Sequence, residues 1–125
     1  MAETTSGCLT TIGLFAGIGG IELGLSRAGY RTEMICEIDP GAAEVLRRRF
    51  GMHVKPDIRA LGAFPKVDLI AAGFPCQDLS QAGRTAGIRG QQSRLVGEVF
   101  ERLRSKANGP SWLLLENVPF MLQLQ

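Results

Sequence analysis

The chain has 125 residues, 45% hydrophobic and 21% charged, which is ordinary for one soluble globular domain with a single hydrophobic core. Its net charge of +2 is too small to identify a nucleic-acid partner, and no apolar run approaches the ~20 residues of a membrane span. Three widely spaced cysteines without a CxxC pair exclude a zinc site and a disulfide framework, and the polar N-terminus lacks a signal-peptide pattern, so we expect a cytoplasmic protein.

The first third of the chain has the pattern of a strand, a helix and a second strand. Leu9–Phe15 is an apolar run with β-branched residues, and a glycine-rich turn follows it. Apolar residues then recur at helical spacing until Gly29, which suits a helix stop. A second strand is predicted over Thr32–Ile38.

A second helix is predicted to begin at Pro40, because the fixed φ and missing N–H of proline are tolerated at the first helical position. Gly51 is expected to end this helix. Its buried side is predicted to consist of Val45, Leu46 and Phe50. A weak third strand is expected near His53–Lys55.

The second half of the chain repeats the alternation. Val67–Ala72 is a continuous apolar run, typical of a central parallel strand covered on both faces. Residues 73–93 lack a clear periodicity, and a loop of this length is usually functional or mobile. An amphipathic helix from Leu95 is expected to end at Asn108–Pro110, before a fifth strand over Trp112–Leu115. This order predicts an α/β fold with a parallel sheet.

Basic residues gather in two places. One is the run Arg47–Arg49, and the other is the segment 84–106, where basic residues outnumber acidic ones. Such segments could contact a phosphate backbone, or they could be solvated helix faces, and charge alone favours the second interpretation.

A glycine-rich loop joins the first predicted strand to the first helix, which allows a ligand to approach the backbone closely. The loop consists of Phe15, Ala16, Gly17, Ile18, Gly19 and Gly20. Glu37 ends the next predicted strand, twenty positions after Gly17, and its carboxylate could accept hydrogen bonds from both hydroxyls of a ribose. The pattern predicts a site for a nucleoside-containing cofactor, although a purely structural turn is an alternative.

Two cofactors compete for this site. A dinucleotide fingerprint would read GxGxxG, but Glu22 occupies the third glycine position. A carboxylate there would oppose a pyrophosphate at the helix N-terminus, whereas S-adenosylmethionine has no phosphates. The loop, the missing glycine and Glu37 together favour S-adenosylmethionine over NAD.

Cys76, preceded by Pro75, follows the predicted central strand. Its thiolate could add to carbon 6 of a cytosine and thereby make carbon 5 nucleophilic toward a methyl group. Such a base must first be flipped out of the duplex. A lone cysteine is more often a small buried hydrophobe, and we interpret Cys8 and Cys36 in that way.

Glu116 and Asn117 follow the fifth predicted strand. The carboxyl ends of parallel strands meet at one edge of the sheet, so these residues are expected beside the glycine loop, Glu37 and Cys76. A carboxyl group such as Glu116 could stabilise the cytosine adduct at N3. Each residue alone would more often be a surface or turn residue.

These segments together resemble the ordered motifs of the DNA cytosine-5 methyltransferase family, over nearly the whole chain from Thr11 to Pro119. The matching segments are Phe15–Gly20, Glu37–Ile38, Asp57–Ile58, Gly73–Gln77 with Ser80, and Glu116–Val118. Their order and spacing make the resemblance specific. It implies a Rossmann-like, S-adenosylmethionine-dependent methyltransferase fold that acts on double-stranded DNA.

The resemblance also implies a role for individual residues. Cys76 would be the nucleophile, Glu116 would recognise the cytosine, and Asn117 would position Pro75 and Cys76. The implied cofactor contacts are the glycine loop, Glu37 at the ribose, Ile38, Asp57 and Ile58 at the adenine, and Leu95 at the pocket border. The implied DNA contacts are Gln77, Ser80, Arg84 and Arg89.

The family continues well beyond the Glu-Asn-Val motif, with a later arginine-bearing motif and a target-recognition domain. We therefore expect residues 1–125 to be the N-terminal portion of a catalytic domain, with a sheet incomplete at its C-terminus. Three hypotheses remain: a truncated or split methyltransferase completed by a second chain or by the missing segment, an S-adenosylmethionine-binding fragment without transfer activity, and, less favoured, an NAD-binding Rossmann domain.

Overall fold

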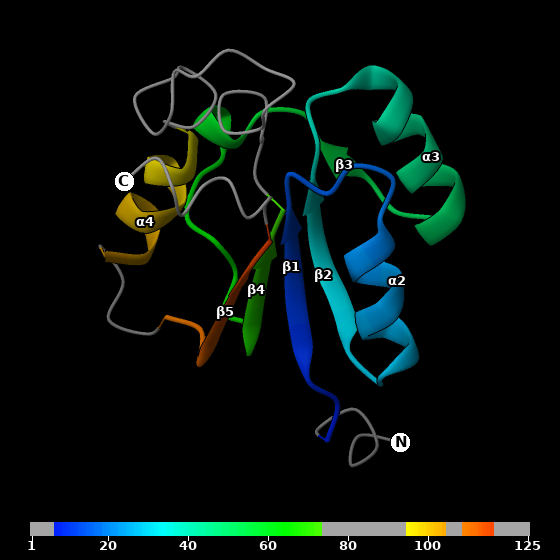
Figure 1. Ribbon diagram of the computed structural model, residues 1–125. Coiled ribbons are helices and arrows are strands. Elements are labelled where there is room, and N and C mark those ends of the chain that lie inside the picture. The colour runs from blue at the N-terminus through cyan, green and yellow to red at the C-terminus, as the bar shows by residue number, and fades with distance from the viewer. Residues whose placement is uncertain (1–6, 74–94, 105–108, 117–125) are drawn as a thin grey trace.

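The computed structural model describes residues 7–73, 95–104 and 109–116 of the chain (Figure 1). Its strands are β1 (Thr10–Leu14), β2 (Arg31–Cys36), β3 (Val54–Lys55), β4 (Leu69–Ala72) and β5 (Trp112–Leu115). Its helices are α2 (Gly20–Arg27), α3 (Pro40–Phe50), the short 3₁₀ helix η1 (Ile58–Ala60) and α4 (Leu95–Arg104). Every strand predicted from the sequence is present, and so is every helix.

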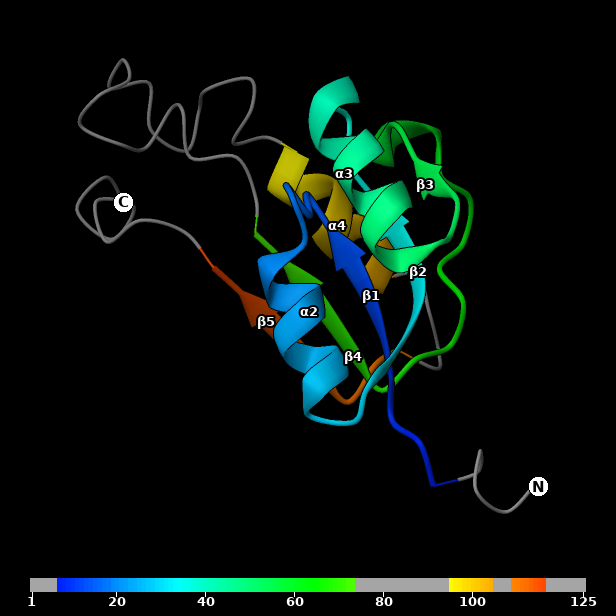
Figure 2. The ribbon, with the colours of Figure 1, turned by 90° about the vertical axis from the view of Figure 1, so that its right-hand side faces the viewer.

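The strands form one sheet in the order β3-β2-β1-β4-β5, and all four pairings are parallel. This confirms the predicted α/β fold. Helices α2 and α3 lie on one face of the sheet and α4 lies on the other, as Figure 2 shows from the side. Parallel strands need helical crossovers of this kind, which is why both faces of the inner strands are apolar.

Two apolar clusters hold the layers together. On the α4 side, Val99 of α4 packs with residues of β1 and β4, including Ile12 and Ile70, each at most 1% exposed. On the other side, Leu46 of α3 packs against Ile35 of β2. All four residues of β4 are buried, as its uninterrupted apolar run predicted.

Helix α3 begins and ends where the sequence predicted, but the prediction that Val45 belongs to its buried side is wrong. Asp39 caps the N-terminus by accepting the Ala42 N–H at 2.8 Å, and Gly51 ends the helix with φ 63°. Ala43 and Leu46 are buried, whereas Val45 is 38% exposed. Consecutive helical residues differ by about 100° in direction, and here Leu46 faces Ile35 of the sheet while Val45 is turned toward solvent.

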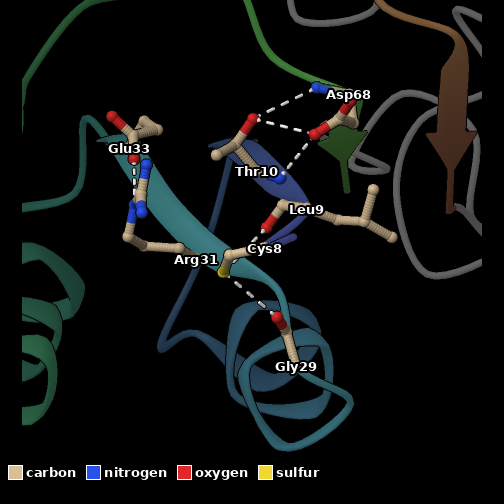
Figure 3. A network of polar contacts seen from close by, with 7 residues as sticks. All are labelled: Cys8, Leu9, Thr10, Gly29, Arg31, Glu33 and Asp68. Atoms are coloured by element: carbon tan, nitrogen blue, oxygen red, sulfur yellow. Dashed lines mark hydrogen bonds and ion pairs between the residues drawn. The ribbon is translucent and has the colours of Figure 1, made fainter. Parts of the chain in front are cut away.

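The amino ends of the central strands are joined by polar contacts (Figure 3). Asp68 Oδ2 accepts hydrogen bonds from the backbone N–H of Thr10 at 2.8 Å and from its hydroxyl at 3.1 Å. Nearby, the Cys8 thiol donates to the Gly29 carbonyl at 3.4 Å. This network fixes β1 against β4 at the edge of the sheet opposite the glycine loop.

No helix within the described residues is long and apolar enough to cross a membrane.

Candidate active site

The predicted functional residues that follow strands in the described part of the chain lie beyond the carboxyl ends of those strands, at one edge of the sheet. Sheet-type backbone bonds continue to the first residues after the strands: Ala16 N–H to Cys36 O (3.2 Å), Glu37 N–H to Lys55 O (2.9 Å), Gly73 N–H to Leu14 O (3.2 Å) and Glu116 N–H to Ala72 O (3.1 Å). The positions of these residues are therefore set by the rigid ladder, which is what a preorganised site requires.

The loop after β1 has an unusual backbone. Phe15 has φ 50°, a left-handed conformation that is rare for an aromatic residue, and Gly17 and Gly19 follow with φ 60° and 91°. Strain of this kind is often found at functional sites. Gly19 is also tightly packed, because a Cβ built there would lie 2.6 Å from Phe50 Cε2 and 2.8 Å from Leu46 Cδ2. At Gly17, by contrast, a Cβ would meet nothing within 4 Å.

Glu37 connects the glycine loop to the start of α3. Its Oε1 accepts a hydrogen bond from the Gly17 N–H at 2.7 Å, and its Oε2 accepts one from the Asp39 N–H at 2.8 Å. Each carboxylate oxygen has a second lone pair, so two hydroxyl donors can still be accommodated. The predicted ribose-binding acid is thus held beside the predicted cofactor loop.

Glu116 lies close to the same loop, although β4 separates β5 from β1. A Cβ built at Gly73 would lie 3.3 Å from Glu116 Oε1 and 3.6 Å from the Phe15 carbonyl oxygen. The missing side chain at Gly73 therefore leaves the space in which the Glu116 carboxyl and the glycine loop approach each other. This brings together two segments that are about a hundred residues apart in the sequence.

Asp57 follows β3 and forms a close ion pair with Arg59. The carboxylate accepts the Arg59 backbone N–H at 2.9 Å, its Nε at 3.0 Å and its Nη2 at 2.9 Å. These hydrogen bonds hold the pKa of Asp57 below its ordinary value. Arg59 is not predictable from the sequence, because an arginine two residues after an acid carries no motif signal of its own.

The segment after Asp57 is held from both sides. Ile58 is 4% exposed and packs in the core, whereas Ile38, two residues after β2, is 59% exposed. Arg102 of α4 donates to the Leu61 carbonyl at 3.1 Å and also pairs with Glu98 at 2.7 Å. Helix α4 therefore supports the segment that carries Asp57.

Several of the described basic residues pair with acids of their own helix. Arg48 pairs with Glu44 one turn earlier at 2.8 Å, and Arg47 lies 3.5 Å from the same carboxylate. These two pairs support the solvated helix-face interpretation for Arg47 and Arg48. Arg102, whose side chain is only 18% exposed, is instead packed within the fold.

Glu22 is the least expected residue of the region. It stands in the first turn of α2 and is 2% exposed, and its carboxyl packs over β1, where a Cβ built at Gly13 would lie 2.8 Å from Glu22 Cδ. Among the described residues, no group forms a hydrogen bond with its Oε1. Burial raises the pKa of Glu22, and the nearby charge of Glu37 raises it further. Sequence rules place acids on surfaces, so this packing could not be anticipated.

Cys36 behaves as the sequence predicted for a structural cysteine. It is 3% exposed, and burial raises the pKa of its thiol to about 11. A thiol with such a pKa is almost entirely protonated at neutral pH and is a poor nucleophile. The other predicted structural cysteine, Cys8, is partly exposed and hydrogen-bonded to backbone carbonyls.

Several predicted site residues lie outside the described part of the structure. They are Pro75, Cys76, Gln77, Ser80, Arg84, Arg89 and Asn117. Leu95 begins α4 as expected, but its side chain is also outside the description.

The described residues fit a nucleoside-containing cofactor. Along the sheet edge they run from Asp57 after β3, through Glu37 after β2 and the glycine loop after β1, to Glu116 after β5. The Glu37 carboxylate keeps acceptor capacity for two hydroxyl groups, and Gly17 leaves open space beside it. This geometry defines the class of the protein: an α/β domain with a parallel sheet, a class whose ligands bind at the carboxyl ends of the strands.

Comparison with known proteins agrees with this fold class and identifies the family within it. A family model for C-5 cytosine-specific DNA methylases matches residues 9–125, and the chain belongs to that family. It is 52% identical over 119 residues to the Type II methyltransferase M2.BsuMI of Bacillus subtilis (strain 168), a match that covers 93% of this chain and 31% of that relative.

Two further comparisons support the assignment. The chain is 41% identical to the Type II methyltransferase M.BanI of Aneurinibacillus aneurinilyticus, covering 86% of this chain and 26% of M.BanI. The crystal structure of S. pombe Dnmt2 methyltransferase superposes with a TM-score of 0.66 at 25% identity, covering 88% of this chain and 34% of that one. The chain thus spans about a third or less of these relatives.

S-adenosylmethionine is the methyl donor of this family, which decides between the two cofactors that the sequence left open. The observed Glu22 adds a physical reason against NAD, since a buried acid in the first turn of α2 would disfavour a pyrophosphate there.

Proposed function

We propose that this chain carries the cofactor-binding and nucleophile-bearing part of a DNA cytosine-5 methyltransferase. The observation that carries the proposal is the convergence of Glu37, the glycine loop and Glu116 on one sheet edge. Cys76 is three residues beyond Gly73, and three residues span at most about 11 Å. The nucleophile is therefore within reach of the space between the glycine loop and Glu116.

The proposed chemistry begins with a cytosine that is flipped out of double-stranded DNA. The Cys76 thiolate forms a bond to carbon 6, and the displaced electron pair makes carbon 5 nucleophilic. S-adenosylmethionine supplies the methyl group as an activated sulfonium substituent. After the methyl group has been added, the carbon 5 proton leaves to a base, the carbon–sulfur bond breaks, and the thiolate is regenerated.

The other site residues hold the substrates in place. The Glu116 carboxyl hydrogen-bonds N3 of the cytosine and stabilises the negative charge that the adduct places on the ring. Asn117 positions Pro75 and Cys76, and the proline restricts the backbone before the nucleophile. Gln77, Ser80, Arg84 and Arg89 contact the DNA, with the arginines at phosphates. Glu37 binds the ribose, while Asp57 and Ile38 contact the adenine.

We further propose that residues 1–125 act with additional protein segments, which either continue this chain or belong to a second polypeptide. Within the described sheet, β5 is paired only with β4, and its other edge is open. On β5, Trp112 is 70% exposed and Leu114 is 41% exposed, so an apolar strand face lies next to Glu116. Exposed edges of this kind are docking sites for further strands.

A methyl-transfer assay tests the proposed function. The purified chain is incubated with methyl-tritiated S-adenosylmethionine and duplex DNA, alone and with the polypeptide encoded directly downstream. We expect binding of S-adenosylmethionine in both samples and 5-methylcytosine only in the second, because target recognition needs segments beyond these motifs. Transfer by the chain alone would refute the need for a partner. Binding without transfer in both samples would favour a cofactor-binding fragment, and absence of binding would refute the proposed function.

A further inference from the structure

Glu22 has the features of a functional residue rather than a structural one. A carboxyl group that is 2% exposed and has an oxygen without a hydrogen bond among the described residues makes the folded state less stable. An apolar side chain would avoid that penalty, and an isosteric amide would avoid the part that arises from the charge. Residues that lower stability in this way are concentrated at sites where binding or catalysis uses them.

The packing against Gly13 places the Glu22 carboxyl between β1 and the first turn of α2, the two elements that the glycine loop joins. Gly13, which it covers, lies in β1 only two residues before Phe15, and Glu22 itself lies two residues after Gly20. The glycine loop spans the gap between these two positions (Figure 1). With no side chain at Gly13, the carboxyl can occupy the wedge between the strand and the helix.

The order of the strand ends indicates which part of the cofactor passes this wedge. Glu37, the proposed ribose acid, follows β2, and the segment that carries the nucleophile begins after β4. Because β1 lies between β2 and β4, the part of the cofactor that links its ribose to the nucleophile crosses the end of β1. That stretch of S-adenosylmethionine contains the sulfonium and the amino-acid group. Its α-ammonium group offers three N–H donors and a full positive charge, the complement of an unpaired buried carboxylate.

We propose that the Glu22 carboxylate binds the α-ammonium group of S-adenosylmethionine, directly or through one water molecule. This inference rests on the proposed function and assigns a residue to the amino-acid end of the cofactor. It also accounts for the pairing of a glycine at position 13 with an acid at position 22. Any side chain at position 13 would clash with the Glu22 carboxyl, and without Glu22 the space between strand and helix would hold no negative charge.

Calorimetric titration of the full chain with three ligands tests the assignment. S-adenosylmethionine carries both cations, S-adenosylhomocysteine keeps the ammonium but lacks the sulfonium, and 5′-methylthioadenosine lacks both. We expect Glu22→Gln to weaken the first two about ten- to hundredfold, because a charge-assisted hydrogen bond is lost, and to leave the third within about twofold. Glu37→Gln is the matched control and should weaken all three, because each ligand contains the ribose.

Three results would overturn the assignment. Equal weakening of all three ligands would indicate that Glu22 only supports the loop. Weakening of S-adenosylmethionine alone would indicate that the sulfonium is its partner. Unchanged affinities would remove Glu22 from the site. If the wild-type chain binds none of the ligands, the proposed function itself fails, and this inference fails with it.

Thermal melting as a function of pH verifies that Glu22→Gln is folded and that the wild-type residue is buried. The pKa of Glu22 is raised in the folded state, so wild-type stability falls as pH increases from the ordinary glutamate value toward the raised value. The variant should therefore melt at the same temperature as wild type near pH 4 and at a higher temperature near pH 7. A variant that melts lower at both pH values would contradict the buried, unpaired carboxyl.

Discussion

Glu37→Gln is expected to lose both cofactor affinity and stability, although it is the most conservative change available at this position. Both carboxylate oxygens accept backbone N–H groups, from Gly17 and from Asp39. A glutamine amide has one acceptor oxygen, so its NH₂ group would face an N–H donor. We expect a loss of about 1–2 kcal/mol in the free energy of unfolding and at least a tenfold loss in S-adenosylmethionine affinity.

Glu33→Gln is a suitable control, because Glu33 lies on the same strand and pairs with Arg31 at the surface. An exposed pair contributes little, so its removal should change stability by no more than about 0.5 kcal/mol. Urea denaturation and calorimetric titration measure the two quantities. If Glu37→Gln and Glu33→Gln had the same stability and the same affinity for S-adenosylmethionine, Glu37 would not connect the loop to the cofactor.

Substitutions in the glycine loop are expected to separate its structural from its binding role. Gly19→Ala adds a Cβ at φ 91° that would lie 2.6 Å from a ring carbon of Phe50 and 2.8 Å from Leu46, which is fully buried. The left-handed backbone and the overpacked contact together should cost about 2–4 kcal/mol. Gly17→Ala meets no atom within 4 Å, so it should cost only the backbone term of about 1–2 kcal/mol.

The two variants should differ in binding as well. The Cβ of Gly17→Ala would enter the open space beside Glu37, where we expect the cofactor, and so should weaken binding more than its small effect on stability suggests. Gly24→Ala, in the interior of α2 with open space around it, serves as the matched control and should stabilise the chain by about 0.5–1 kcal/mol. Equal destabilisation by the Gly17 and Gly19 substitutions would contradict the packing seen around Gly19.

The fold was largely predictable because its signals are local. Gly51 ends a helix in a left-handed conformation, Pro40 begins one, and the apolar run of β4 has the length and composition of a buried strand. The face of α3 was harder to predict. Ala43 carries a weak hydrophobic signal and Val45 a strong one, yet the helix is turned so that Ala43 is buried.

The site could be predicted only as far as the topology of the sheet determined it. Parallel strands bring Glu37 and Glu116 to one edge whatever their side chains do, so their proximity to the glycine loop follows from the alternation of elements. The burial of Glu22 over Gly13 and the closure of Arg59 onto Asp57 depend on side-chain packing between particular positions. Neither has a periodicity or a motif in the sequence that could reveal it.

The most direct test of the methyltransferase assignment is a covalent trap at Cys76. Duplex DNA containing 5-fluorocytosine is incubated with S-adenosylmethionine and the chain, with and without the downstream polypeptide, and adducts are detected by mass spectrometry. Because fluorine at carbon 5 cannot leave as a proton does, the carbon–sulfur bond should persist. We predict an adduct that Cys76→Ser abolishes and Cys8→Ser leaves intact. An adduct that survives Cys76→Ser, or the absence of any adduct in both samples, would contradict the assignment of Cys76 as the nucleophile.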